Sequence, residues 1–184
     1  AIAVRVVAKR ADSVPLADAV GFSGSIAATF DTDAAYCKVA KLTSTTFLVA
    51  YTEYGGSYEL KVRVGTLSGE DISFGENLVV STQWSGVTAL VALSPTKAVV
   101  VTEQWQTNPD TLDAYVLTVS GTVVTAGAKT TVNTANTSLL NLALCALDAS
   151  TVLLAYGEGT TTPTFGSAAR VGTVSGTDIT FGAA

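Results

Sequence analysis

The sequence contains no histidine in its 184 residues. Histidine is the commonest general base and completes the Ser-His-Asp and Cys-His nucleophile systems, so its absence excludes these classes of enzyme. The usual zinc sites are excluded for the same reason. No P-loop, no GxGxxG motif after a strand and no EF-hand loop occurs in the chain. We therefore expect a protein that is not an enzyme, holds no metal and uses no cofactor.

Charged residues are also scarce, at 14% of the chain, and the net charge is −5. An acidic chain repels nucleic acid and anionic membrane surfaces, so neither is expected as a partner. Long hydrophobic runs are missing too, since no apolar run approaches the roughly 18 residues that a membrane helix needs. The sequence therefore predicts no nucleic-acid partner and no membrane span.

Short apolar segments, by contrast, are abundant. Hydrophobic residues make up 48% of the chain, which is enough for one domain with a sizeable core and argues against disorder. Segments such as TALVALSP and TVLLAYG are rich in valine, leucine and threonine, which suits β-strands. The composition therefore predicts an all-β protein.

Two blocks of sequence occur three times each. LTSTTFLVAYTE (Leu42–Glu53) aligns without a gap with LDASTVLLAYGE (Leu147–Glu158), and ALSPTKAVVVTE (Ala92–Glu103) is a middle copy, one small gap more distant. The second shared block is VGTLSGEDISFG (Val64–Gly75), VLTVSGTVVTAG (Val116–Gly127) and VGTVSGTDITFG (Val171–Gly182). The chain therefore consists mainly of three repeats of about 50 residues.

Each repeat is predicted to form four antiparallel β-strands. In the first repeat these cover residues 36–42, 46–53, 58–67 and 72–81. The second strand is apolar on both faces, as expected for a strand that lies between neighbouring sheets. The Ser-Gly pair after the third strand has the composition of a hairpin turn.

A glycine recurs at the same position of the predicted fourth strand in every repeat. These residues are Gly75, Gly127 and Gly182. A glycine inside a strand indicates a β-bulge or the close approach of another backbone. We expect one of these features in each repeat.

Sheets of four antiparallel strands at this period are typical of β-propellers. The pattern L-D-x-x-x-x-L-V-A-Y-x-[DE], followed by V-x-T-V-S-G-T-x-I-T-F-G, resembles a propeller-type repeat of phage and prophage virion proteins and bacterial surface proteins. The resemblance covers residues 36–184, and the middle copy departs from it with Ala126 in place of Phe74 and Phe181. It implies three β-propeller-like blades and a location in a virion or on an extracellular surface.

Three blades are too few for a closed propeller, which typically has four to eight. We therefore expect the ring to be completed by another chain or by a strand exchange. Two chains could close a ring of six blades, which would make the protein a homo-oligomer. Alternatively, the segment Gly24–Asp31 could complete the third blade.

Residues 1–23 do not match the repeat, so the chain divides into an N-terminal arm (1–23) and a repeat domain (24–184). AIAVRVVAKR alternates like a strand, and the residues after it, with Pro15, interrupt the pattern. The arm could anchor the chain by adding a strand to another protein's sheet. It could equally form an edge strand within this chain.

Cys37 and Cys145 are the only cysteines, too few for a disulfide scaffold. Counted back from the matching Leu42 and Leu147, they lie five and two residues away. Successive residues of a strand point to opposite faces, so this difference in parity places the two thiols on opposite faces. We expect two free, buried thiols.

Three carboxylates align at the end of the second strand of the repeats: Glu53, Glu103 and Glu158. Propeller symmetry would place them on one face of the molecule at equal radius. Carboxylates arranged in this way could hold cations or accept hydrogen bonds from sugar hydroxyls. The alternative is that each caps a strand end and meets solvent or a local backbone N–H group.

The loop after each of these glutamates varies and carries aromatic residues. These are Tyr54, Tyr58, Trp105 and Phe165, and Asp110 lies in the same loop as Trp105. Aromatic rings beside carboxylates are what a carbohydrate site uses, since rings stack on sugar faces while polar groups fix orientation. The alternative is that Tyr58 and Phe165 cover sheet edges. Trp84 lies between two repeats and is expected to pack there.

These features support two expectations for function. The first is a non-enzymatic structural or attachment module of a virion, such as a phage head fibre, decoration or tail component, or of a cell surface. Its partners would be other virion or surface proteins, bound through the N-terminal arm. The second is a lectin-like, carbohydrate-binding propeller that uses the repeated glutamates and the loop aromatics. A polysaccharide hydrolase is a third, less supported reading.

Overall fold

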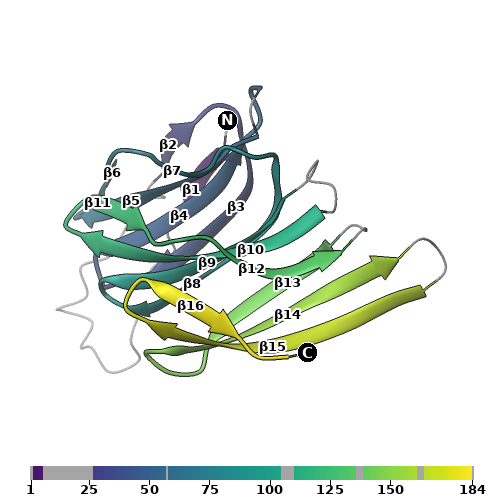
Figure 1. Ribbon diagram of the computed structural model, residues 1–184. Coiled ribbons are helices and arrows are strands. Elements are labelled where there is room, and N and C mark those ends of the chain that lie inside the picture. The colour runs from purple at the N-terminus through teal and green to yellow at the C-terminus, as the bar shows by residue number, and fades with distance from the viewer. Residues whose placement is uncertain are drawn as a thin grey trace, which may run out of the picture.

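The computed structural model of this chain describes residues 2–5, 27–56, 58–104, 110–135, 139–160 and 164–183. All regular elements in these residues are β-strands in antiparallel pairs, which confirms the predicted all-β class. Three larger sheets follow one another along the chain and form a curled, open stack (Figure 1). Among the described residues there is no helix long and apolar enough to cross a membrane.

Sheet 1 is built from the strands predicted for the first repeat. Its strands are β3 (Ala34–Lys41), β4 (Thr46–Glu53), β5 (Leu60–Ser68), β6 (Asp71–Phe74) and β7 (Leu78–Ser81). β3, β4 and β5 are neighbours in that order, and β6 and β7 both pair with β5. The predicted fourth strand is therefore interrupted between Phe74 and Leu78.

The other two repeats form sheets of the same plan. Sheet 2 contains β8 (Ser85–Ser94), β9 (Lys97–Gln104), β10 (Asp110–Ser120), β11 (Val123–Ala126) and β12 (Thr130–Ala135). Sheet 3 contains β13 (Leu139–Ala146), β14 (Thr151–Thr160), β15 (Thr164–Ser175) and β16 (Asp178–Phe181). β5 and β10 have second partners in β7 and β12, whereas in the part of the chain that the structure describes β15 pairs only with β14 and β16.

A Ser-Gly turn joins the third and fourth strands of each sheet, as predicted. The glycines Gly69, Gly121 and Gly176 have φ angles of 59°, 61° and 61°. This left-handed conformation is costly for residues with a Cβ atom, which explains why glycine recurs at this position.

The interruption of the fourth strand is also a place where neighbouring sheets touch. The amide of Gly75 donates to the carbonyl of Val64 at 2.9 Å, which keeps the glycine close to β5. A Cβ atom on Gly75 would overlap the backbone carbonyl oxygen of Thr122 in the turn of sheet 2. Gly127 stands in the same relation to Thr177 in the turn of sheet 3. The predicted close approach of another backbone is confirmed at both glycines.

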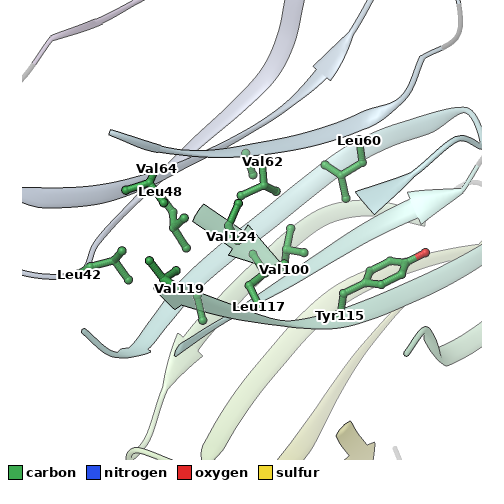
Figure 2. Close-up of a cluster of buried hydrophobic side chains, with 12 residues drawn as sticks. Leu42, Leu48, Leu60, Val62, Val64, Val100, Tyr115, Leu117, Val119 and Val124 are labelled. Atoms are coloured by element: carbon green, nitrogen blue, oxygen red, sulfur yellow. The ribbon is translucent and has the colours of Figure 1, made fainter. Parts of the chain in front are cut away.

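Apolar side chains of alternate parity cover the two faces of each sheet. We call the face toward the next sheet in the chain the forward face and the opposite one the rear face. The forward face of sheet 1 packs on the rear face of sheet 2 in one buried cluster, in which Figure 2 labels ten side chains. The forward residues are Leu48, Ala50, Leu60, Val62 and Val64, and the rear residues are Ala98, Val100, Tyr115, Leu117, Val119 and Val124. Full burial of a valine or leucine side chain contributes about 1.5–3 kcal/mol, so this contact holds the two sheets together.

Sheets 2 and 3 pack in the same way. The forward residues of sheet 2 are Val99, Val101, Leu112, Ala114 and Val116, and the rear residues of sheet 3 include Val152, Leu154, Tyr156, Val174 and Ile179. Two polar contacts cross this junction: the Lys97 ammonium donates to the Gly176 carbonyl, and the Thr130 hydroxyl donates to the Ile179 carbonyl. The first strands β3, β8 and β13 also lie close together in succession.

The rear face of sheet 1 contains Phe47, Val49 and Tyr51, and all three are buried. Here β1 (Ile2–Arg5) and β2 (Ala27–Asp31) form a separate two-stranded sheet, with β2 beside β6. The N-terminal strand is therefore paired within the chain. The alternative that Gly24–Asp31 completes the third sheet is wrong for β2, because its residues pair with β1. The rest of the predicted arm, 6–23, lies outside the described residues.

The forward face of sheet 3 has no further sheet on it among the described residues. Val171 is 46% exposed there, whereas the equivalent Val64 and Val116 are fully buried. The predicted antiparallel sheets are thus present, with the fourth strand divided in two in sheets 1 and 2, but the described residues do not form a closed ring of blades.

The two thiols lie on different faces, as predicted, and both are free. Cys37 is half-buried and packs against the rear-face residues of sheet 1. Cys145 pairs across the strands with Leu153 on the forward face of sheet 3 and is exposed. The prediction of two buried thiols is therefore wrong for Cys145, because no sheet of the described residues covers its face.

Candidate functional site

The strand register corrects the predicted set of equivalent glutamates. Glu53 pairs with Ala34 and Glu158 pairs with Leu139, each near the start of the first strand of its sheet. In sheet 2 the residue at this place is Gln104, which pairs with Ser85. The predicted equivalence of Glu103 is wrong, because the strand register matches Leu93–Gln104, and not Ala92–Glu103, with Leu42–Glu53.

A one-residue shift moves a strand side chain to the other face of the sheet. Glu103 is fully buried on the forward side of sheet 2, so its carboxylate does not meet the solvent. Gln104 is fully buried on the rear side, where its amide accepts a hydrogen bond from the Ser81 hydroxyl at 3.1 Å and donates to the Ser85 hydroxyl at 3.2 Å. This network joins β7 of sheet 1 to sheet 2.

Glu53 is the one of the three glutamates whose described side chain reaches the surface. Its carboxylate lies 2.8 Å from the Lys61 ammonium, which is also 3.7 Å from Glu59. Burial alone would lower the pKa of Lys61, but the hydrogen bond and charge of Glu53 outweigh it, so the pKa is raised. Glu53 is therefore engaged in an ion pair at the end of β4.

Three aromatic side chains from two loops meet beside this ion pair in the chain. The rings of Tyr54 and Tyr58 lie 4.7 Å apart at 71°, and those of Tyr58 and Trp84 lie 4.2 Å apart at 34°. Tyr54 and Trp84 are exposed, and Tyr58 lies between them. We call these residues, together with the exposed Tyr36, the aromatic cluster.

The backbone holds this cluster in place. The Ser85 amide donates to the Tyr58 carbonyl at 2.9 Å, which ties the loop after β4 to the start of sheet 2. Tyr58 has a φ of 52°, a conformation that is costly for a bulky residue and persists only where its surroundings enforce it. Desolvation and the nearby hydroxyls of Tyr54 and Tyr36 raise the pKa of Tyr58.

Tyr36 owes its own positive φ of 51° to a different cause. A β-bulge interrupts the pairing of β3 between Ala35 and Lys38, and β13 has the same irregularity at Asn141, where φ is 60°. The conformation of Tyr36 is therefore a property of the repeat, whereas that of Tyr58 belongs to the cluster.

The structure brings together only part of the predicted site. Tyr54 and Tyr58 lie side by side next to Glu53, and Asp110 is half-buried at the start of β10. Trp105 lies outside the described residues. Glu158 and Phe165 are placed by their strand pairing alone.

Sequence reasoning missed Trp84 and Tyr36 as members of the cluster. Trp84 was expected to pack between repeats; it does stack on Tyr58, but one side remains exposed. A signal was available, because in a sheet of sequential antiparallel strands the loop after the second strand and the loop before the next sheet lie at the same end.

A groove lies at the junction of sheets 1 and 2. Its volume is about 590 Å³, and its lining includes Arg63, Asn77, Leu78 and Thr122. The Arg63 guanidinium donates to the Gly75 carbonyl at 2.8 and 3.1 Å, and it lies 5.4 Å from the Phe74 ring. The guanidinium thus fixes the interrupted strand.

Asp31 and Asp33 form a turn before β3, since the Asp33 amide donates to the Asp31 carboxylate at 3.0 Å. No group of three or more His, Cys, Asp and Glu side chains that could hold a metal occurs within the described ranges.

A scan against protein-family models and searches of curated proteins and of solved structures find no match to this chain.

Proposed function

We propose that this chain is a non-enzymatic attachment module of a virion, such as a phage head fibre, decoration or tail component, or of a cell surface. The observation that carries the proposal is the aromatic cluster, an exposed group of rings on loops that a body of packed sheets holds in position. Binding residues commonly lie on loops of a rigid scaffold, and tyrosine and tryptophan are enriched at interfaces.

We propose further that the three sheets are blades of a propeller-like array. Each blade is a run of sequential antiparallel strands, the first strands lie in succession, and each sheet covers the forward face of the one before it. The resemblance of the repeats to those of virion and surface proteins points the same way. Strand β1 of the N-terminal arm pairs within the chain, so residues 6–23 of the arm would be the segment that joins the module to a larger particle.

The second candidate function is carbohydrate binding by the same cluster. Two exposed rings, Tyr54 and Trp84, flank the half-buried Tyr58, so a sugar ring could stack on either. Glu53 directly precedes Tyr54 in the chain, and its ion pair with Lys61 would supply hydrogen-bonding groups for hydroxyls. These features favour a glycan as the target to which the module attaches.

A fluorescence titration tests both proposals. The chain has two tryptophans, so Trp105→Phe leaves Trp84 as the only tryptophan reporter. Purified protein is titrated with a panel of soluble polysaccharides, and its binding to intact bacterial cells is measured separately. We expect saturable quenching or a spectral shift of Trp84 with at least one polysaccharide. Tyr54→Ala in the fluorescence titration, and Trp84→Ala in isothermal titration calorimetry because it removes the reporter, should each weaken binding at least about tenfold, or ~1.4 kcal/mol.

Val123→Ala is the matched control, because Val123 is exposed but lies at the hairpin end of β10, away from the cluster. It should bind like the parent, and all variants should keep the melting temperature of the parent. If the protein binds to cells but responds to no polysaccharide, the attachment proposal is supported and the glycan target is excluded. Binding to cells that survives both cluster substitutions would contradict the proposed site.

A further inference from the structure

Sheet 3 presents a surface that is buried in both other sheets. On its forward face Leu153 pairs with Cys145 and Val171, and Ala155 pairs with Ala143 and Ala169. The register aligns Leu153 with Leu48 of sheet 1 and Val99 of sheet 2, both of which are fully buried by the next sheet. The same apolar positions are thus repeated a third time without a sheet to cover them among the described residues.

A second feature of each junction is also repeated, namely the space beside the glycine that follows the first part of the interrupted fourth strand. We call this space the notch. Gly75 and Gly127 leave space for the turn of the following sheet, whose Thr122 and Thr177 carbonyls occupy it. Gly182 has the same hydrogen bond to β15 as its counterparts, from its amide to the Val171 carbonyl at 3.0 Å. A Cβ atom there would meet nothing closer than that carbonyl, at 3.9 Å. Among the residues that the structure describes, the notch at Gly182 is therefore open.

We propose that this forward face and notch are a docking surface for sheet 1 of a second copy of this chain. Sheet 1 carries the same hairpin turn, with Glu70 at the position of Thr122 and Thr177, and this turn is exposed. Its rear face has the large apolar residues Phe47, Val49 and Tyr51 to place against Leu153 and Val171. The inference does not depend on what the aromatic cluster binds.

Charge favours this occupant. At the junction of sheets 1 and 2 the turn threonine and the Arg63 side chain line the same groove. The equivalent of Arg63 in sheet 3 is Arg170, whose guanidinium donates to the Gly182 carbonyl at 3.4 Å and to the Tyr156 hydroxyl at 2.9 Å. An incoming sheet 1 would bring the Glu70 carboxylate to this groove, opposite Arg170. Each turn inside the chain carries a neutral threonine there instead.

A second copy can dock only if the residues that cover the rear face of sheet 1 within its own chain are displaced. The rear face of sheet 1 is buried in the single chain, where Asp31 of β2 interacts with Tyr51. Association therefore exchanges one apolar contact for another, and we expect it to be moderate in strength and dependent on concentration. Two such contacts related by a twofold axis would join two chains into a closed dimer.

Sedimentation velocity of the full chain from micromolar to millimolar concentration tests the inference. The parent should move from monomer to dimer as its concentration rises. Glu70→Arg should weaken the dimer at least about tenfold, and Glu70→Arg combined with Arg170→Glu should restore it, because the pair is reversed rather than lost. Gly182→Leu should abolish the dimer while leaving the melting temperature unchanged, since its Cβ has free space in the monomer.

Ser120→Leu is the control for an added apolar side chain, because Ser120 is exposed at the hairpin end of sheet 2. It should dimerise like the parent. In a Cys37→Ser background, thiol labelling of Cys145 should slow as the dimer forms, because Cys145 lies on the docking face. The proposal is overturned by a parent that stays monomeric, by a dimer that tolerates Gly182→Leu, or by one that ignores Glu70→Arg, which would indicate two forward faces in contact.

Discussion

The carbonyl oxygen of Thr177, in the hairpin turn of sheet 3, lies where a side chain on Gly127 of sheet 2 would begin. The same relation joins Thr122 and Gly75 at the previous junction. Each sheet thus inserts its turn into the interrupted fourth strand of the sheet before it. The absence of a Cβ atom at these two positions sets how closely neighbouring sheets approach.

The first prediction follows from this contact. Gly127→Ala should destabilise the fold by about 1–3 kcal/mol, because the new methyl group overlaps a backbone carbonyl that is tied into a turn and cannot move alone. Gly75→Ala should have an effect of similar size. Urea denaturation of the three alanine variants measures the difference, with Gly182→Ala as the matched control that should change stability by less than about 0.5 kcal/mol. Equal losses at all three positions would contradict the packing described for Gly127.

The second prediction concerns the buried amide of Gln104. Gln104→Glu removes the N–H donor to Ser85 and places a carboxylate in a fully buried site, so it should destabilise the fold at pH 7. Burial should raise the pKa of the new carboxyl. Its cost to folding is therefore smallest at pH values where the carboxyl is also protonated in the unfolded chain. The deficit relative to the parent should therefore shrink as pH falls from 7 toward 4.

Gln104→Leu separates charge from hydrogen bonding in this test. It leaves the Ser81 and Ser85 hydroxyls without their amide partner and should cost about 1–3 kcal/mol at every pH. Thermal unfolding of both variants across the pH range gives the comparison. A deficit of Gln104→Glu that does not change with pH would show that its carboxylate reaches solvent.

The third prediction concerns Asp31, at the end of β2. Burial would raise the pKa of its carboxyl, but hydrogen bonds from the Asp33 amide and the Tyr51 hydroxyl and the charge of Lys61 outweigh this, so the pKa lies below the ordinary 3.8. A carboxyl whose pKa is lower in the folded chain than in the unfolded chain stabilises the fold at pH values above its unfolded pKa. Asp31 should therefore stabilise the chain at pH 5–7 and lose this effect as pH falls below about 3.8.

Asp31→Asn is the variant that measures this contribution. Because Asp31 is only half-buried and solvent screens its charge, the loss at pH 7 should be below about 1 kcal/mol. The two unfolding curves should converge as pH falls through the pKa of the native carboxyl. A variant as stable as the parent at pH 7, or a gap that widens in acid, would contradict the assigned interactions.

The strands and their turns were predictable from local sequence. Alternation of apolar residues in β5, and apolar runs such as β4, follow from the period of two in a strand, and glycine at the Ser-Gly turns follows from the positive φ they need. Repetition of Gly75, Gly127 and Gly182 also predicts a bulge or a backbone contact, and the contact is present at Gly75 and Gly127. These features depend on sterics within a few residues, which the sequence carries directly.

The candidate site was predictable only in part. Tyr54 and Tyr58 follow Glu53 in one loop, so their proximity is a property of the sequence. Trp84 comes 26 residues after Tyr58 and meets its ring because sheet 2 begins where the loop of sheet 1 ends. Such a contact depends on how the chain returns between sheets, which no local pattern specifies.

The sequence by itself determined that the chain forms repeated antiparallel sheets with glycine at defined turns and notches. Only the tertiary structure decided the register, and with it that Gln104 rather than Glu103 is the counterpart of Glu53. The physical reason is that the hydrogen bonds between two strands fix which residue of one strand lies opposite which residue of the other. An alignment of Ala92–Glu103 with Leu42–Glu53 that is displaced by one residue matches similar letters, yet it assigns every side chain to the opposite face of its sheet.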